Sequence, residues 1–181
     1  NPEALRAALA DFAGSGAHAA LQGLVTLNGD RAGGEMRLYD LTTPAQRPIA
    51  QKKFEVPAGQ VRRLAHKIAD EVMLQFTGVL GSADTRIAFV RSRPDRKGKE
   101  LYTIDYDGAG LTPLTEYGSI TLSPAWSPDA RSLAFTSYLK GYPDLYRLFV
   151  FERRPLQTLA AFLGINAAPA WSPDGRQVAL T

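Results

Sequence analysis

One seven-residue pattern occurs twice in this chain: residues 124–130 read PAWSPDA and residues 169–175 read PAWSPDG. Its Ser-Pro-Asp-Gly part has the residue order of a type I turn, in which Ser can cap the first position and Pro fixes φ at the second. A strand-like apolar run follows each copy, over residues 131–136 and 176–181. The pattern therefore predicts a repeat architecture built from one turn-and-strand unit.

The only two tryptophans, Trp126 and Trp171, precede the two turns and stand 45 positions apart. A period of about 45 residues that combines strands and turns is typical of the four-stranded blades of a β-propeller. We interpret the two rings as a repeated packing element; a ligand-stacking role is the alternative.

Other features recur at nearly the same separation. They are Leu101-Tyr102 with Leu145-Tyr146, Leu111 and Leu114 with Leu156 and Leu159, and the apolar run 86–90 with the run 133–136. The repeats predict that residues 86–181 form an incomplete β-propeller of about two four-stranded blades, with the first strand of a third.

Residues 1–80 lack the repeat and have the pattern of a small α/β domain. Helical spacing marks residues 2–12, and strand patterns mark residues 19–27, 35–41 and 49–56. The first two strands are expected to form a hairpin through a turn-rich segment that includes Gly29, Gly33 and Gly34.

A second helix is expected between Pro57 and Gly78. Its apolar spacing predicts one buried face, formed by Val61, Leu64, Ile68, Val72 and Phe76, with Arg62, Arg63, Lys67, Asp70 and Glu71 off that face. The predicted order is an α/β domain over residues 1–80, incomplete at its N-terminus, a linker over 81–85 and the partial propeller over 86–181. A connection this short favours rigid coupling of the two regions.

Composition excludes several classes of protein. The 181 residues contain no cysteine, so disulfides and cysteine-zinc sites are excluded. The net charge of +3, from 21 basic and 18 acidic residues, does not indicate a nucleic-acid partner. No run reaches the roughly 18 apolar residues of a membrane-spanning helix, and a chain that starts at Asn1 and stops within a repeat is expected to be a fragment.

Motifs of catalysis and cofactor binding are not found in the sequence. It has no G-x-S-x-G elbow and no glycine-rich phosphate loop. The two histidines, His18 and His66, are far apart in the sequence and are interpreted as surface or hydrogen-bonded residues rather than metal ligands. The sequence thus predicts no catalytic residue, no cofactor and no metal site, and it leaves the partner-binding residues unassigned.

Two sets of acidic residues can be interpreted either as structural or as functional. Residues 105–108, DYDG, are expected to form a hairpin turn, because a calcium loop would need further spaced carboxylates and a terminal Glu. Asp129 and Asp174 could act as an acid-base pair, but their equivalent places in the two turns indicate a structural role.

The basic run at residues 91–99, RSRPDRKGK, connects two predicted strands. A solvated hairpin tip is the simpler interpretation, and contact with an acidic partner or a phosphate is the alternative. Without interleaved aromatic residues the run does not predict a nucleic-acid groove.

Four segments in order along the chain resemble the TolB family, the periplasmic component of the Tol-Pal system of Gram-negative bacteria. They are FTG at 76–78, TRIAFV at 85–90, LYTIDYDG at 101–108 and LSPAWSPD at 122–129. The resemblance covers essentially the whole chain, with departures near the N-terminus, where Phe12 replaces a Trp and His18 replaces an Asp of the family pattern.

The resemblance implies a non-enzymatic periplasmic scaffold with an α/β domain and a six-bladed propeller. Its implied partners are the lipoprotein Pal at the outer membrane and other Tol proteins, and its implied roles are envelope integrity during cell division and colicin import. No nucleic acid, no cofactor and no direct membrane span are implied.

Two rival interpretations remain open at this level. The propeller that gates a serine peptidase of the prolyl-oligopeptidase type shares such heptads, and it would require a G-x-S-x-G elbow after Thr181. A lectin-like propeller that binds sugars or cations is the other. Open propeller edges at residues 178–180 also predict self-association of this chain.

Overall fold

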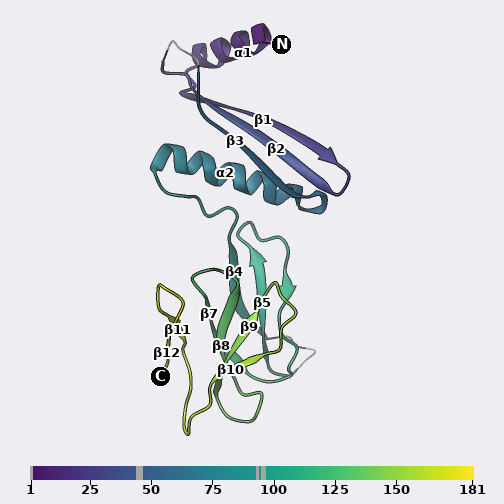
Figure 1. The fold of residues 1–181 in the computed structure, drawn as a ribbon, viewed down its shortest axis with the longest axis vertical. Helices are drawn as coiled ribbons and strands as arrows, with labels where there is room; N and C mark the ends of the chain where they lie inside the picture. The colour runs from purple at the N-terminus through teal and green to yellow at the C-terminus, as the bar shows by residue number, and fades with distance from the viewer. Residues whose placement is uncertain (1, 44–46, 93, 95–96) are drawn as a thin grey trace. The chain divides into compact units, whose positions relative to one another are not determined.

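The computed structural model describes residues 2–43, 47–92, 94 and 97–181. The chain forms two compact units, Asn1–Asp84 and Thr85–Thr181. The predicted fold class is confirmed: a helix-and-sheet unit is followed by a unit of short antiparallel sheets (Figure 1). No helix in the described part of the chain is both long enough and apolar enough to cross a bilayer.

The first unit is an antiparallel sheet of three long strands with two helices. Its elements are α1 (Pro2–Gly14), β1 (Ala19–Asn28), β2 (Arg31–Asp40), β3 (Pro48–Pro57), a single 3₁₀ turn η1 (Ala58–Gln60) and α2 (Val61–Thr77). The strand order is β1-β2-β3. α2 packs its buried Leu64 against Ala32 of β2 and Val56 of β3, and this contact forms the core between helix and sheet.

The hairpin turn between β1 and β2 is tighter than the sequence predicts. Asn28 pairs with Arg31, so Gly29, at φ 59°, belongs to the turn, whereas Gly33 and Gly34 lie inside β2. The prediction that these two glycines form the turn is therefore wrong. Gly34 has a packing role instead, because a Cβ there would come within 2.8 Å of the Leu64 side chain.

The buried residues of α2 also differ from the predicted face. Of the five apolar residues on that face only Leu64 is fully buried, while Val61 and Phe76 are exposed. Asp70 and Glu71, predicted to lie off the face, are buried, at 6% and 4% exposure. Both carboxylates are buried because each has polar partners outside the helix, on the segment that follows α2 for Asp70 and on β3 for Glu71.

The second unit consists of three antiparallel sheets. The first contains β4 (Arg86–Ser92), β5 (Lys99–Asp105) and β6 (Thr112–Pro113). The second contains β7 (Thr121–Trp126), β8 (Ser132–Ser137), β9 (Asp144–Phe149) and β10 (Gln157–Ala160), and the third pairs β11 (Ala170–Trp171) with β12 (Val178–Ala179). Leu101, Phe135 and Tyr146 form the core of this unit.

Among the described residues only the middle sheet has the four strands of a complete blade. β4 corresponds to β8, the second strand of that blade, so the first sheet lacks a strand in the place of β7. The residues that precede β4 contact α2 instead. The predicted partial propeller, of about two blades and the first strand of a third, thus consists of one four-stranded sheet between a three-stranded and a two-stranded sheet.

The repeated turn has the predicted geometry in both copies. The N–H of Ala130 donates to the carbonyl of Ser127 at 2.8 Å, and the N–H of Gly175 donates to the carbonyl of Ser172 at 2.9 Å. Each Ser also binds the Asp two positions on, at 2.6 Å. The turn is therefore a closed local network that the chain repeats.

Candidate protein-protein interface

Three loops meet at one end of the four-stranded sheet. The segment 138–143 joins β8 to β9, the segment 161–169 follows β10, and the segment 114–120 precedes β7, and strand pairing places all three at the same end. Backbone hydrogen bonds connect them. Tyr138 donates its N–H to the carbonyl of Ile120 at 2.9 Å, and Asn166 donates its N–H to the carbonyl of Pro143 at 3.0 Å.

These loops expose large apolar side chains. Leu163 is fully exposed, Tyr142 is 74% exposed, and Phe162 and Ile165 are each 71% exposed. We define the apolar loop surface as the exposed residues Ile120, Tyr138, Leu139, Tyr142, Phe162, Leu163 and Ile165. Grouped apolar side chains that remain in water are typical of a surface that binds another protein.

A buried asparagine holds the most exposed loop in shape. Asn166 is only 1% exposed. Its Oδ1 accepts the N–H of Phe162 at 3.1 Å, and its Nδ2 donates to the carbonyl of the same residue at 2.9 Å. The loop tip from Phe162 to Ile165 is therefore fixed before any partner binds, which lowers the entropy cost of association.

A second buried group supports the loop at 114–120. The Glu100 carboxylate accepts hydrogen bonds from the Thr115 hydroxyl and from the N–H of Gly118, both at 2.6 Å. Burial, and then the charge of Glu100, raises the pKa of the neighbouring Tyr117 phenol, which stays neutral at neutral pH. The loop at 114–120 is therefore also fixed in shape, at the same end of the sheet as the loop held by Asn166.

Basic side chains lie beside the apolar loop surface. Lys99 donates its N–H to the carbonyl of Ser119 at 2.8 Å, which places the hairpin between β4 and β5 at the same end. Lys97, Lys99 and Lys140 are exposed there. Arg93, Asp95 and Arg96 of the predicted basic run lie outside the described residues. The charge of the described lysines favours an acidic partner.

The acidic residues considered as catalytic have turn roles. Asp129 accepts hydrogen bonds from the Ser127 hydroxyl and the N–H of Arg131, and these two contacts lower the pKa of its carboxyl. The pKa of Asp174 is lowered by the equivalent contacts with Ser172 and Arg176. Each carboxylate is thus engaged within its own turn.

Main-chain contacts also hold the DYDG segment and His18. The DYDG segment forms the predicted turn, since the N–H of Gly108 donates to the carbonyl of Asp105 at 2.9 Å. The carbonyl of His18 accepts the N–H of Leu41 at 3.0 Å. Within the described ranges no group of three or more His, Cys, Asp or Glu residues could hold a metal ion.

The open face of the sheet in the first unit carries paired charges. Arg31 contacts Glu55 at 2.6 Å, and Lys53 contacts Glu35 at 3.3 Å. The pKa of Glu35 is lowered chiefly by Lys53, against a smaller opposing effect of burial. These charges neutralise one another, so this face offers a weaker site for a charged ligand than the loop end of the second unit.

Sequence reasoning missed the apolar loop surface. The segment Phe162-Leu163-Gly164-Ile165 follows a strand, where a polar turn is the usual choice. Three large apolar residues in such a place are a signal that could have identified it.

A helix-and-sheet unit followed by blade-like antiparallel sheets defines the chain as part of a β-propeller protein. The family profile described as the TolB beta propeller domain matches residues 73–181. The chain belongs to this TolB family.

Named relatives extend the match into the first unit. The Tol-Pal system protein TolB of Roseobacter denitrificans is 37% identical over 153 residues, which are 82% of this chain and 34% of that protein. The Tol-Pal system protein TolB of Desulfosudis oleivorans is 39% identical over 139 residues, 77% of this chain and 31% of that protein. The chain thus spans about a third of the length of these relatives.

A solved structure has the same fold. The crystal structure of TolB from Acinetobacter baumannii matches with a TM-score of 0.80 and 27% identity, over 94% of this chain and 42% of that chain. Both units are included in a match of this extent.

Proposed function

We propose that this chain is part of a non-enzymatic, periplasmic interaction scaffold of the Tol-Pal system, and that its apolar loop surface binds the lipoprotein Pal. Contacts with other Tol proteins, a role in envelope integrity during division and use by colicins are parts of the same proposal. Membership of the TolB family supports the system.

The observation that carries the proposal is the loop tip held by Asn166. Phe162, Leu163 and Ile165 project into solvent from a loop with a fixed main chain. A rigid apolar projection supplies binding area at low entropy cost, and nearby lysines select the charge of the partner. Such a surface needs no catalytic group.

The test is the affinity of the chain for purified Pal from the same bacterium, measured by isothermal titration calorimetry. Leu163→Ser removes a fully exposed apolar side chain and should weaken binding about tenfold or more, as central apolar contacts do.

The matched control is Leu111→Ser. Leu111 is 47% exposed in the loop between β5 and β6, at the opposite end of its sheet. Its substitution should leave the affinity unchanged. Absence of Pal binding by the unsubstituted chain, or an equal loss in both variants, would contradict the proposal.

A further inference from the structure

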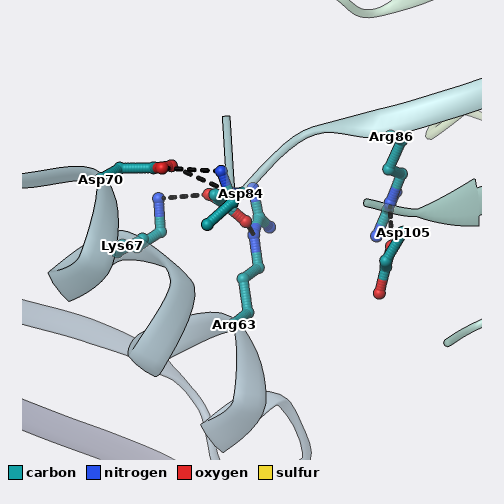
Figure 2. Close-up of polar contacts among 7 residues, drawn as sticks. Arg63, Lys67, Asp70, Asp84, Arg86 and Asp105 are labelled. Atoms are coloured by element: carbon teal, nitrogen blue, oxygen red, sulfur yellow. Dashed lines mark hydrogen bonds and ion pairs between the residues drawn. The ribbon is translucent and has the colours of Figure 1, made fainter. Parts of the chain in front are cut away.

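The Asp70 carboxylate holds the segment that leaves α2. Asp70 Oδ1 accepts the N–H of Ala83 at 2.7 Å, and Oδ2 accepts the N–H of Asp84 at 2.9 Å (Figure 2). The carbonyl of Asp70 also accepts the N–H of Gly81 at 3.4 Å. Hydrogen bonds from the main chain to an ionised carboxylate are stronger than those between neutral groups. One helix residue therefore fixes three positions of the following segment.

Asp84 adds a second attachment to the same helix. Its carboxylate contacts Arg63 Nε at 2.8 Å and Lys67 Nζ at 3.0 Å (Figure 2). Burial alone would raise the pKa of Asp84, but the hydrogen bonds from Arg63 and Lys67 outweigh it and lower the pKa. Arg63, Lys67 and Asp70 are separated by four and three positions, so they form one polar stripe along α2.

Gly81 allows the close approach of the segment to the helix. A Cβ at this position would lie 2.3 Å from Asp70 Oδ1 and 2.9 Å from Asp70 Cα. Any larger residue must therefore displace the segment or the carboxylate. We use the term latch for the contacts of Asp70 and Asp84 described here.

The next residue along the chain is held by the second unit. The carbonyl of Thr85 accepts the N–H of Tyr106 at 3.1 Å. Arg86 binds Asp105 at 3.1 Å (Figure 2), and its guanidinium lies 5.0 Å from the centre of the Phe151 ring. Firm attachment to one unit thus ends at Asp84, and attachment to the other begins at Thr85.

We propose that the latch fixes residues 79–84 to the first unit, so that only the Asp84–Thr85 peptide remains as the joint about which the two units turn. Asp70 is the positioning residue of this device. When the latch opens, six residues become a flexible linker that can extend to about 20 Å. With the latch closed, a partner bound to one unit can therefore restrict the orientation of the other unit, and with the latch open it cannot.

Two measurements on the full chain test this proposal. Hydrogen exchange at the amides of Ala83 and Asp84 reports the latch, and pulsed electron paramagnetic resonance reports the distance distribution between the units. Because the chain has no cysteine, spin labels can be attached at Thr26→Cys and Thr158→Cys, two exposed strand positions in different units.

Asp70→Asn replaces one acceptor oxygen with an NH₂ group that faces a backbone N–H, with little change in size. Exchange at Ala83 and Asp84 should become at least tenfold faster, and the distance distribution should become about twice as wide. Gly81→Ala should have the same two effects without a change of charge. Asp11→Asn on α1 is the control and should change neither measurement.

The proposal is overturned if Asp70→Asn and Gly81→Ala leave the exchange of both amides unchanged. It is equally overturned if the amides lose protection while the distance distribution keeps its width, because the latch would then not restrain the joint. Circular dichroism identifies a variant that fails to fold, and the other variant then decides between these outcomes.

Discussion

Trp171 donates its indole N–H to the backbone carbonyl of Ala125, at 3.1 Å and across 46 positions of the sequence. This bond connects the third sheet of the second unit to β7 of the complete blade. The guanidinium of Arg147 lies 5.2 Å from the centre of the Trp171 ring, and its Nε donates to the Ser132 hydroxyl at 2.9 Å. The ring is therefore a contact between neighbouring blades, as the sequence repeat predicts.

Trp126 occupies the equivalent place one repeat earlier but differs in its bonding. Its Nε1 is buried and has no partner among the described residues. The carbonyl that would correspond to that of Ala125 belongs to the strand that the first sheet lacks. The indole N–H of Trp171 thus has a hydrogen-bond acceptor, whereas the indole N–H of Trp126 has none among the described residues.

Trp171→Phe should destabilise the second unit by about 1 kcal/mol more than Trp126→Phe does, because both variants lose the pyrrole part of the indole but only Trp171→Phe also loses a hydrogen bond. In Trp126→Phe the removal of a buried donor without a partner offsets part of the packing lost with the pyrrole ring, so its net cost should be smaller. Urea unfolding of each variant, followed by far-UV circular dichroism, measures the difference. Equal losses in the two variants would show that the Ala125 bond contributes nothing specific.

Ala130→Gly should stabilise the first copy of the turn. Ala130 has φ 55°, in the left-handed region where an L-residue other than glycine is strained, and Gly175 fills the same place in the second copy at φ 70°. Relief of this strain exceeds the entropy that glycine adds to the unfolded chain, so we expect a gain of about 0.5–1 kcal/mol.

Gly175→Ala is the reciprocal variant and should cost a similar free energy. Its added Cβ would meet only an ordinary contact, 3.6 Å from Pro128 Cδ, so the effect isolates the backbone angle. Tryptophan fluorescence follows both variants, since Trp126 and Trp171 both lie in the second unit. A loss of stability in Ala130→Gly would refute the strain argument.

The repeated turn could be predicted because its signal is local. Ser, Pro and Asp stand in consecutive positions and satisfy one another, so the sequence alone contains the whole network. The polar residues of α2 could not be predicted in this way. Asp70 and Glu71 are buried by partners 13 and 19 positions away, and helical periodicity carries no information on such partners.

The apolar loop surface was missed for a related reason. Its residues come from separate loops and are brought to one end of the sheet only because β7, β8, β9 and β10 are paired in register. Exposure of Leu163 and Ile165 has no periodic signature, unlike burial in a strand.

Acid should weaken the contact between α2 and β3 through Glu71. The hydrogen bond from Lys52, at 2.5 Å, lowers the pKa of this buried carboxyl against the opposing effect of burial, and Gln75 contributes further. Because the folded-state pKa is below the ordinary value of about 4.3, the stabilisation is complete above that pH. It is lost as the pH falls through the lower folded-state pKa.

Glu71→Gln should therefore cost about 1–2 kcal/mol at pH 7 and make the stability of the first unit less dependent on pH below about 4.3. Glu55→Gln is the matched control, because Glu55 and its partner Arg31 are both about half exposed and such a pair contributes little. Far-UV circular dichroism during urea titration at several pH values measures both variants. An unchanged acid dependence in Glu71→Gln would assign the effect to other carboxyls.

Asn166→Ala tests whether the fixed shape of the loop contributes to binding in addition to its apolar side chains. The substitution leaves Phe162, Leu163 and Ile165 in place but removes both side-chain bonds that fix their loop. The loss of a fully buried hydrogen-bonding side chain should cost the second unit about 1–3 kcal/mol.

Binding of Pal by Asn166→Ala should also weaken, because the loop must then be ordered during association. Leu163→Ser should also weaken binding but leave the stability of the second unit unchanged, since Leu163 is fully exposed. Calorimetric titration and urea unfolding of the two variants measure both quantities. Full affinity in a folded Asn166→Ala chain would mean that the preformed loop shape does not contribute to recognition.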